Sequence, residues 1–377
     1  MKLDDDVLAY IDEHVDEYRN LLLSLARIPA PTMHEERRAK FIRSWLSAKG
    51  AEKVTIDDEK NVICSIGDCE GDRPLVVFMA HMDVVFPDTE ELPLQVENGR
   101  ICCPGVGDDT ANLVALLFAA AYILERGLVS RKYGILIVAN SAEEGLGNLR
   151  GSKRIMEKYG SRVARFISLD SWNGVVNHAS IGSRRFRISV DTEGGHSYYD
   201  AGRRNAIATL SSMVDALYRM KTPSDKTTYN VGVISGGSSV NAIAAHAEML
   251  FEYRAESIEN GNIMEKQIRT LIDEYRSCGI SVGCEVIGDR PCMGRVDEKG
   301  MNELMELSRR VYSAYYGKEP VFKAGSTDCN IPLSMGIPSI CIGCFDGDGA
   351  HTRDEYVLVD SLVTGYRIAF AHILYFL

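Results

Sequence analysis

An excess of basic residues is absent from this chain of 377 residues, and so is any apolar run of membrane-spanning length. Lys and Arg number 42 and Asp and Glu number 53, which gives a formal net charge of −11. Such an acidic chain disfavours broad contact with nucleic acid or with an anionic membrane surface. The longest uncharged apolar run, Leu113–Leu124, is too short to cross a bilayer and predicts a buried helix. We therefore expect neither a nucleic-acid partner nor a membrane partner.

The sequence also lacks the marks of a secreted protein. Residues Met1–Asp6 are acidic and contain neither the basic nor the apolar region of a signal peptide. The ten cysteines are scattered along a chain long enough to form its own core, so we expect a cytoplasmic protein with reduced thiols. Cys341 and Cys344 form a C-x-x-C motif, which is compatible with a redox or zinc site. Because this motif lies in an apolar strand and has no second C-x-x-C, we predict buried structural thiols.

Hydrophobic patterns divide the chain into an outer and an inserted part. In the outer part, continuous apolar runs alternate with helical segments, which predicts an α/β domain with a sheet that is covered on both faces and at least partly parallel. The predicted strands are Leu75–Met79, Ile135–Val138, Phe166–Leu169 and Ser339–Ile342. The predicted helices are Leu113–Glu125, Lys153–Tyr159, Met301–Tyr315 and Val359–Tyr375.

The inserted part has a different order of predicted strands and helices. Its predicted order is strand, helix, strand, strand, helix, strand, which is typical of a ferredoxin-like α+β unit. We place this unit at residues 183–291, so the α/β domain is discontinuous and comprises residues 1–182 and 292–377. The predicted strands are Arg184–Val190, Tyr229–Ile234, Ala247–Arg254 and Ser281–Ile287, and the predicted helices are Ala206–Met220 and Ile258–Tyr275.

Carboxylate or imidazole side chains follow every predicted strand of the α/β domain. Since the carboxyl ends of parallel strands meet at one edge of a sheet, we expect these side chains to lie together. An acidic pair that precedes the long apolar helix joins the same set. In chain order the residues are His81, Asp83, Asp108, Asp109, Glu143, Glu144, Asp170 and His351.

Each of these residues also has a simpler explanation when it is taken alone. Asp108 could cap the helix that begins near Asn112, and Glu143 with Glu144 could form a solvated loop. Taken together, however, so many carboxylates at one edge would repel one another unless cations compensated their charge. Imidazole and carboxylate ligands without a thiolate are typical of a hydrolytic zinc pair, and cobalt or manganese also suits such ligands.

As a set, these motifs resemble the M20 family of metallopeptidases and deacylases, and the resemblance covers essentially the whole chain. The motifs are His81-Met82-Asp83, Gly107-Asp108-Asp109, Glu143-Glu144-x-Gly, Asp170 and His351. The resemblance implies an α/β fold with a zinc-exopeptidase-like mixed sheet covered by helices, and with the ferredoxin-like α+β unit inserted as a lid and dimerisation domain. It also implies two divalent metal ions, with zinc as the first choice.

The resemblance further implies which side chains hold the metals. Asp108 would bridge the two ions. The other ligands of one ion would be His81 and Asp170, and those of the second would be Glu144 and His351.

Two more residues of the same motifs would act beside the metals. Glu143 is similar to the general base that deprotonates the water between the ions. Asp83 would hold the ring of His81, which is a common accompaniment of a histidine ligand. The family pattern also implies a cis peptide bond between Asp108 and Asp109.

A second set of residues resembles the substrate-binding part of the family. His196, in a Gly-Gly-His-Ser motif, is similar to a lid histidine that polarises the substrate carbonyl from the partner subunit of a homodimer. Asn241 and Arg254 would hold the substrate carboxylate, since a guanidinium binds a carboxylate in a bidentate manner. Without the other motifs, Arg254 would be interpreted as a surface cation and His196 as a loop residue. Gly325 and Ser326 would line the same pocket.

These residues predict a dinuclear-metal exopeptidase that hydrolyses short peptides. Asp170 favours an aminopeptidase of the tripeptidase type, because carboxypeptidase-type members tend to have Glu at this position. Departures from the family pattern at Thr110, Asn112, Asp200 and Ala244 leave the substrate open. The alternatives are an N-acyl-amino-acid deacylase and, from another class, a metal-free binding or scaffold protein.

Overall fold

The computed structural model describes residues 2–377, which form two compact units. The first unit contains the chain up to Ser180 and the segment Arg295–Leu377, and the second contains Ile181–Gly294. The boundaries expected from the sequence, at residues 182 and 291, lie within three residues of these positions.

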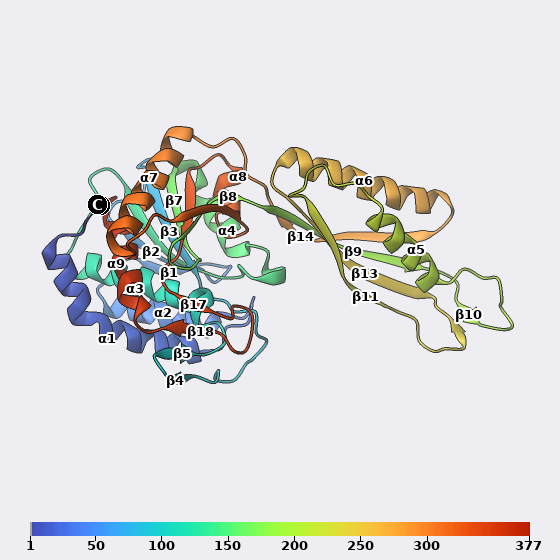
Figure 1. The fold of residues 1–377 in the computed structure, drawn as a ribbon, viewed down its shortest axis with the longest axis horizontal. Coiled ribbons are helices and arrows are strands. Elements are labelled where there is room, and N and C mark those ends of the chain that lie inside the picture. The colour runs from blue at the N-terminus through green and yellow to red at the C-terminus, as the bar shows by residue number, and fades with distance from the viewer. Residues whose placement is uncertain (1) are drawn as a thin grey trace. The chain divides into compact units, whose positions relative to one another are not determined.

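The first unit is built on a mixed sheet of eight strands (Figure 1). Its order is β1-β2-β6-β3-β7-β16-β8-β15. The four central strands β6, β3, β7 and β16 are parallel, whereas β2 and β8 run antiparallel to their neighbours β6 and β16. The strands are β1 (Val54–Ile56), β2 (Val62–Ile66), β3 (Leu75–His81), β6 (Gly134–Asn140), β7 (Val163–Leu169), β8 (Val175–Ser180), β15 (Val321–Gly325) and β16 (Ser339–Ile342).

Helices bury both faces of this sheet, since every residue of β3 and of β6 is buried. Helix α3 packs on β3, β6 and β7, and α1 and α9 pack on α3. The stretch Val106–Glu125 is apolar and long enough to cross a membrane, but 94% of it is buried inside the protein, as expected of a core helix. The helices are α1 (Asp5–Arg27), α2 (Glu36–Ala48), α3 (Asn112–Glu125), α4 (Arg150–Tyr159), α7 (Glu298–Tyr315), α8 (Asn330–Ser334) and α9 (Ser361–Leu374).

A small antiparallel sheet brings the C-terminal loops to the start of α3. In it β18 pairs with β5, so the chain that follows β16 returns beside residues 100–102. The loop that contains His351 lies between β17 and β18. The strands are β4 (Gln95–Glu97), β5 (Arg100–Cys102), β17 (Gly347–Asp348) and β18 (Tyr356–Leu358).

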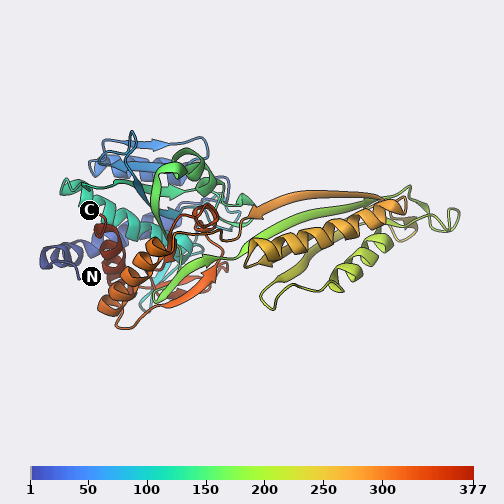
Figure 2. The ribbon, with the colours of Figure 1, turned by 90° about the horizontal axis from the view of Figure 1, so that it is seen from above.

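The second unit is an antiparallel sheet with two helices on one face, and Figure 2 shows α5 and α6 side by side on it. Its order, β11-β13-β9-β14, is that of a ferredoxin-like unit. Inward residues such as Phe186, Ile188 and Phe251 form the core beneath the helices. The elements are β9 (Gly182–Asp191), β10 (Gly195–His196), α5 (Ala206–Tyr218), β11 (Thr228–Gly236), β12 (Ala242–Ile243), β13 (His246–Ala255), α6 (Ile258–Ser277) and β14 (Ser281–Arg290).

Candidate functional site

The candidate site of the first unit lies where its parallel strands end. His81 is the last residue of β3, and Asp170 directly follows β7. Glu143 and Glu144 are in the loop after β6, and both are buried. The apolar runs therefore place the chemistry at one edge of the sheet, because parallel strands end together.

Asp108 lies between two histidines and uses a different oxygen for each. Its Oδ1 is 3.1 Å from Nε2 of His81, and its Oδ2 is 3.0 Å from Nε2 of His351. On the first side, Asp170 Oδ1 is 3.9 Å from His81 Nε2. On the second side, Glu144 Oε1 is 2.9 Å from His351 Nε2. The structure thus brings all the predicted ligands together in two groups that share one carboxylate.

The charges of this cluster fit divalent cations. Burial, together with the charge of Asp109, raises the pKa of Asp170 well above its ordinary value. Hydrogen bonds with Asp108 and Glu144 raise the pKa of His351 to about 10, so a positive charge is strongly favoured between these carboxylates. Donor atoms of His81, Asp108 and Glu144 lie within 4.8 Å of one another. Two imidazoles and three carboxylates form a donor set that suits two divalent metal ions.

Asp83 joins the histidine of β3 to the loop after β6. Its Oδ1 is 3.5 Å from Nδ1 of His81, and that ring nitrogen is 3.1 Å from the Asp83 carbonyl oxygen. The same carboxylate accepts the N–H groups of Glu143 and Glu144, each at 3.0 Å. The charge of Glu143 is also one of those that contribute to the raised pKa of Asp170, after burial and Asp109. Glu143 therefore lies beside the metal-binding cluster, the name we use for the five predicted ligands His81, Asp108, Glu144, Asp170 and His351.

Asp109 and Asn112 form a support that the sequence analysis did not identify. The peptide bond between Asp108 and Asp109 is cis, as the family resemblance implies. One oxygen of Asp109 accepts the His81 N–H at 3.0 Å, and the other accepts Nδ2 of Asn112 at 2.7 Å. Both oxygens are thus engaged, and Asn112, which departs from the family pattern, also accepts the N–H of Cys344 at 2.8 Å.

Glu355 is a second missed residue. Its carboxylate accepts three backbone N–H groups from the turn before α3, those of Gly105, Gly107 and Asp108, at 2.6, 2.9 and 2.7 Å. Burial is the main cause that raises its pKa to about 7. An acidic residue four positions after His351 was the available signal, but its partners are about 250 residues away in the chain.

A buried arginine connects the motif at His81 with the turn at Asp108. Arg38 of α2 is fully buried and donates to the carbonyl oxygen of Met82 at 2.9 Å and to Oγ1 of Thr110 at 3.3 Å. Thr110, another departure from the family pattern, is therefore a hydrogen-bonding partner of this arginine.

The turn after β15 meets the end of β6. Asp328 accepts Nδ2 of Asn140, the last residue of β6, at 2.7 Å. Gly325 ends β15, where a Cβ atom would come within 2.8 Å of the Asn177 side chain, so a larger residue would clash. Ser326, the other predicted pocket residue, is half-buried in the turn.

The predicted residues of the second unit lie at two ends of its sheet. His196 and Asn241 are neighbours, because β10 pairs with β12 and the Ser197 N–H donates to the Asn241 carbonyl oxygen at 3.0 Å. Arg254 is near the other end of β13, eight residues after His246, which corresponds to about 26 Å of strand. One copy of this unit therefore does not bring Asn241 and Arg254 to the same carboxylate.

The loop of His196 defines which ring nitrogen carries the proton. Nδ1 of His196 accepts the N–H groups of Tyr198 and Tyr199 at 3.2 and 3.4 Å. In the neutral ring the proton is then on Nε2, which leaves this nitrogen as a hydrogen-bond donor on an exposed loop.

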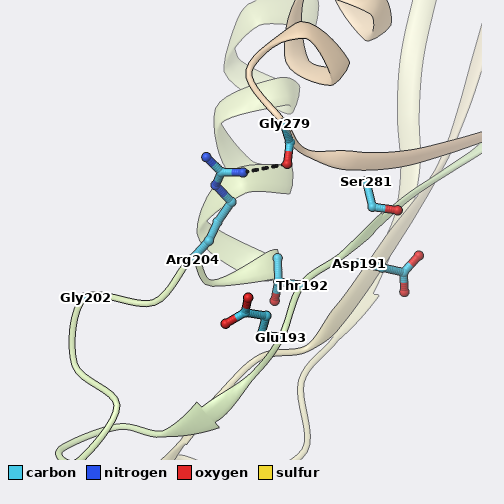
Figure 3. A pocket seen from close by; sticks show the side chains of 7 residues that line it. All are labelled: Asp191, Thr192, Glu193, Gly202, Arg204, Gly279 and Ser281. Carbon is cyan, nitrogen blue, oxygen red and sulfur yellow. Dashed lines mark hydrogen bonds between the residues drawn. The ribbon is translucent and has the colours of Figure 1, made fainter.

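The second unit also has a cavity of about 720 Å³ at the two ends of the loop that carries His196 (Figure 3). Arg204 reaches across it and donates to the carbonyl oxygen of Gly279 at 3.1 Å. None of the predicted site residues, all of which the structure describes, lines this cavity. Its lining residues are Asp191, Thr192, Glu193, Gly202, Arg204, Gly279 and Ser281.

The C-x-x-C motif is buried beside the metal-binding cluster. Cys341 and Cys344 are both free and buried, and burial raises the pKa of each thiol well above its ordinary value. The Cys341 thiol donates to the carbonyl oxygen of Asp170 at 3.0 Å.

Comparisons with known proteins point to one family. The model of peptidase family M20/M25/M40 matches residues 77–374. An acetylornithine deacetylase of Myxococcus xanthus is 25% identical over 355 residues, which are 90% of this chain and 87% of that protein. The structure of aminopeptidase PepT from Bacillus cereus has a TM-score of 0.72 at 20% identity, with 95% and 98% of the two chains covered. A tripeptidase structure from Staphylococcus aureus has a TM-score of 0.74 at 20% identity, with 96% and 98% covered.

Proposed function

The chain belongs to peptidase family M20/M25/M40, and we propose that this metallohydrolase is a dinuclear-metal exopeptidase that cleaves short peptides. The observation that carries the proposal is the position of Asp108, whose two oxygens face two different histidines at 3.1 and 3.0 Å. A carboxylate in this position can serve two ions at once. His81 and Asp170 would complete one metal site, and Glu144 with His351 would complete the other.

We propose zinc as the metal, with cobalt and manganese as alternatives, since the ligands are imidazole and carboxylate without thiolate. Divalent ions bound here would polarise an amide carbonyl and lower the pKa of a water molecule. Glu143 would accept the proton of the attacking water and deliver it to the departing amine. Asp83 would keep His81 and the loop of Glu143 in place, since it contacts both.

We further propose a homodimer in which His196 acts in the site of the partner subunit. The outer strand β11 is an unpaired edge with exposed Val233 and Ile234, and a second copy would cover it. The Nε2 proton of His196 suits a donor to the developing oxyanion. A second copy would also supply an Asn241 from another chain to an Arg254, which one copy of the unit keeps apart.

The proposed substrate is a short peptide with a free C-terminal carboxylate, cleaved from its N-terminal end. Asp170 and the similarity to structures of an aminopeptidase and a tripeptidase support this choice. The second candidate, an N-acyl-amino-acid deacylase, is favoured by the relative that is named acetylornithine deacetylase. Because all ten cysteines are free, we propose a cytoplasmic location.

Substitution of Glu143 by glutamine tests the assignment of the base. The amide has nearly the same shape but cannot accept the proton, so kcat should fall by about 10²–10⁴-fold while both metals stay bound. Loss of metal together with activity would show that Glu143 is a ligand and that the roles of Glu143 and Glu144 are reversed.

A substrate panel separates the two enzymatic candidates. Tripeptides, their C-terminal amides and acetylated or succinylated amino acids should be assayed with zinc-loaded protein, and only the free tripeptides should be cleaved efficiently. Activity confined to acyl amino acids would favour the deacylase. A protein that stays metal-free after zinc supplementation would favour a binding or scaffold protein.

A further inference from the structure

Four successive backbone N–H groups, those of residues 141–144, donate to side-chain oxygens of Asn61, Glu35 and Asp83. All three acceptor residues are fully buried. The loop that carries the proposed base and one proposed ligand is therefore held by side chains from three other segments. Asn61 and Glu35 lie outside the family motifs, and Glu35 holds the residue directly before Glu143, since its Oε1 accepts the Ala142 N–H at 3.1 Å.

Glu35 joins the loop of residues 141–144 to the segment before α2 and does not cap that helix. It precedes α2 at the N-cap position, but its side chain makes no capping hydrogen bond to that helix. Its Oε1 accepts the N–H of Met33 at 2.6 Å as well as that of Ala142. Its Oε2 lies 3.4 Å from Nζ of Lys60. One oxygen thus holds two backbone N–H groups, and the other faces a cation that balances the charge.

The backbone conformation of Ala142 explains why the loop needs the hydrogen bond from the Ala142 N–H to Glu35. Its φ angle is +52°, in the left-handed region that favours glycine and is costly for alanine. Because Ala142 directly precedes Glu143, its conformation sets the direction in which the next two residues leave. A buried N–H without an acceptor would favour rearrangement of this loop.

We propose that Glu35 is a positioning residue, which fixes the left-handed Ala142 by accepting its N–H and thereby aligns Glu143 and Glu144. The inference rests on the proposed function, in which Glu143 is the base and Glu144 is a metal ligand. Glu35 itself would touch neither substrate nor metal. It would act through the acceptor oxygen and not through its negative charge, since Oε1 alone contacts the loop.

Two substitutions of similar size distinguish the hydrogen-bond acceptor role of the Glu35 side chain from its role in packing. Glu35→Gln keeps an oxygen at the position of Oε1, whereas Glu35→Met fills the same space without an acceptor. A misplacement of about 1 Å at an active site can cost about 10²-fold. Glu35→Met should therefore lower kcat by about 10²-fold with little change of KM, and Glu35→Gln should stay within about threefold of the wild type.

Glu36→Gln is the matched control. Glu36 is paired with the same Lys60, at 3.2 Å, but it is half-exposed and does not contact the loop. This variant should behave as the wild type. If Glu35→Met does not fold, Glu35→Asp replaces it, because a carboxylate one methylene shorter cannot reach Ala142.

Two measurements do not depend on turnover. Amide hydrogen exchange of residues 141–144 should accelerate in Glu35→Met and not in Glu35→Gln. Zinc affinity should fall for one of the two ions, since Glu144 is displaced.

A third test uses Ala142→Gly, which removes the cost of the left-handed conformation, so the loss caused by Glu35→Met should be smaller in that background.

The outcomes distinguish this inference from the proposed function. If the wild type hydrolyses no amide, the proposed function fails, and the exchange and zinc measurements then decide the role of Glu35. The role is refuted if Glu35→Met keeps wild-type exchange, zinc affinity and kcat. It is also refuted if Glu35→Gln is as defective as Glu35→Met, because the charge and not the acceptor would then matter.

Discussion

The candidate residues of the two units differ in burial, although the side chain of His351 in the first unit is also 56% exposed. In the first unit His81 is 1% exposed and Asp83 is fully buried, whereas in the second unit His196 is exposed beside Tyr198 and Tyr199, which are 79% and 82% exposed. A buried polar group must find its partners within the fold. The candidate ligands of the first unit therefore contact one another within that unit, whereas His196 of the second unit stays exposed.

The two units also use charge differently. In the first, carboxylates crowd together, and burial raises the pKa of both Asp109 and Asp170 well above the ordinary value. In the second, opposite charges are paired on the open face of the sheet, as Arg187 with Glu285 at 2.8 Å. Uncompensated buried charge indicates a ligand site, whereas balanced surface charge indicates a solvated face.

Removal of Asp108 should give the largest effect, because one side chain would break both halves of the cluster. We expect Asp108→Ala to lose both zinc ions and to lose more activity than the 10²–10⁴-fold or so typical of a missing general base. Metal content measured after dialysis, together with kcat, checks this. Asp88→Ala is the control, since that aspartate pairs with Arg353 on the surface. One firmly held zinc in an active Asp108→Ala enzyme would rule out the shared carboxylate.

Complementation between subunits tests the proposed role of His196, the exposed residue of the second unit. His196→Ala should lower kcat by about 10²–10³-fold, the usual cost of one oxyanion donor, and Glu143→Ala should be similarly inactive. When the two chains are co-expressed, one site of each mixed dimer has an intact Glu143 and a donated His196. The purified mixed dimers should therefore recover about half of the wild-type activity, since one of their two sites is complete. Purified mixed dimers without recovery, or a fully active monomer, would contradict the trans arrangement.

The sequence predicted the features of the first unit that depend on local pattern, which are its central strands and its family motifs. Continuous apolar runs located β3, β6, β7 and β16, and the match of the family model confirms the resemblance to the M20 family. Four strands of the same sheet were missed, namely β1, β2, β8 and β15. The edge strands β1 and β15 lack a continuous apolar run, since they are short and only partly buried. The roles assigned to the site residues remain predictions.

Supporting residues were missed for a different reason. Glu35, Asn112 and Glu355 act on backbone groups that are far away in the chain, and a single sequence carries no sign of such contacts. For Glu355 the partner N–H groups lie about 250 residues earlier. The side chains proposed as metal ligands belong to motifs that resemble a known family, whereas those that hold these motifs in place are recognised only in the folded structure.

Acidification should lower the free energy of unfolding of the first unit, because His372, a buried histidine outside the candidate site, must take up a proton when the chain unfolds. Burial lowers the pKa of His372 from 6.5 to about 4, and its ring nitrogens contact Ser308 and the Ile368 carbonyl oxygen at 3.1 and 2.8 Å. Because the unfolded chain binds this proton more readily, stability is lost as the pH falls from 6.5 towards 4, by about 3 kcal/mol in total. Urea unfolding of wild type and His372→Leu at pH 7 and 4.5 checks this.

The variant should lose less stability on acidification than the wild type. His34→Gln, at an exposed position, should show the wild-type acid dependence. Equal acid dependence of all three proteins would mean that the pKa of His372 is the same in the folded and the unfolded chain, which would contradict the prediction.

The smallest effect is expected for the ion pair between Arg187 and Glu285 on the open face of the second unit. Their side chains are 43% and 64% exposed, and exposed pairs of this kind contribute about 0.2–1 kcal/mol. A double-mutant cycle with Arg187→Ala and Glu285→Ala, measured by urea unfolding at two protein concentrations, gives the coupling energy. We expect a small value that decreases with salt and does not depend on concentration, because the proposed dimer uses the edge strand β11 and not this face. A coupling of several kcal/mol, or one that grows as the protein is concentrated, would show that this face is buried against a second copy and would move the proposed interface from the edge of the sheet to its open surface.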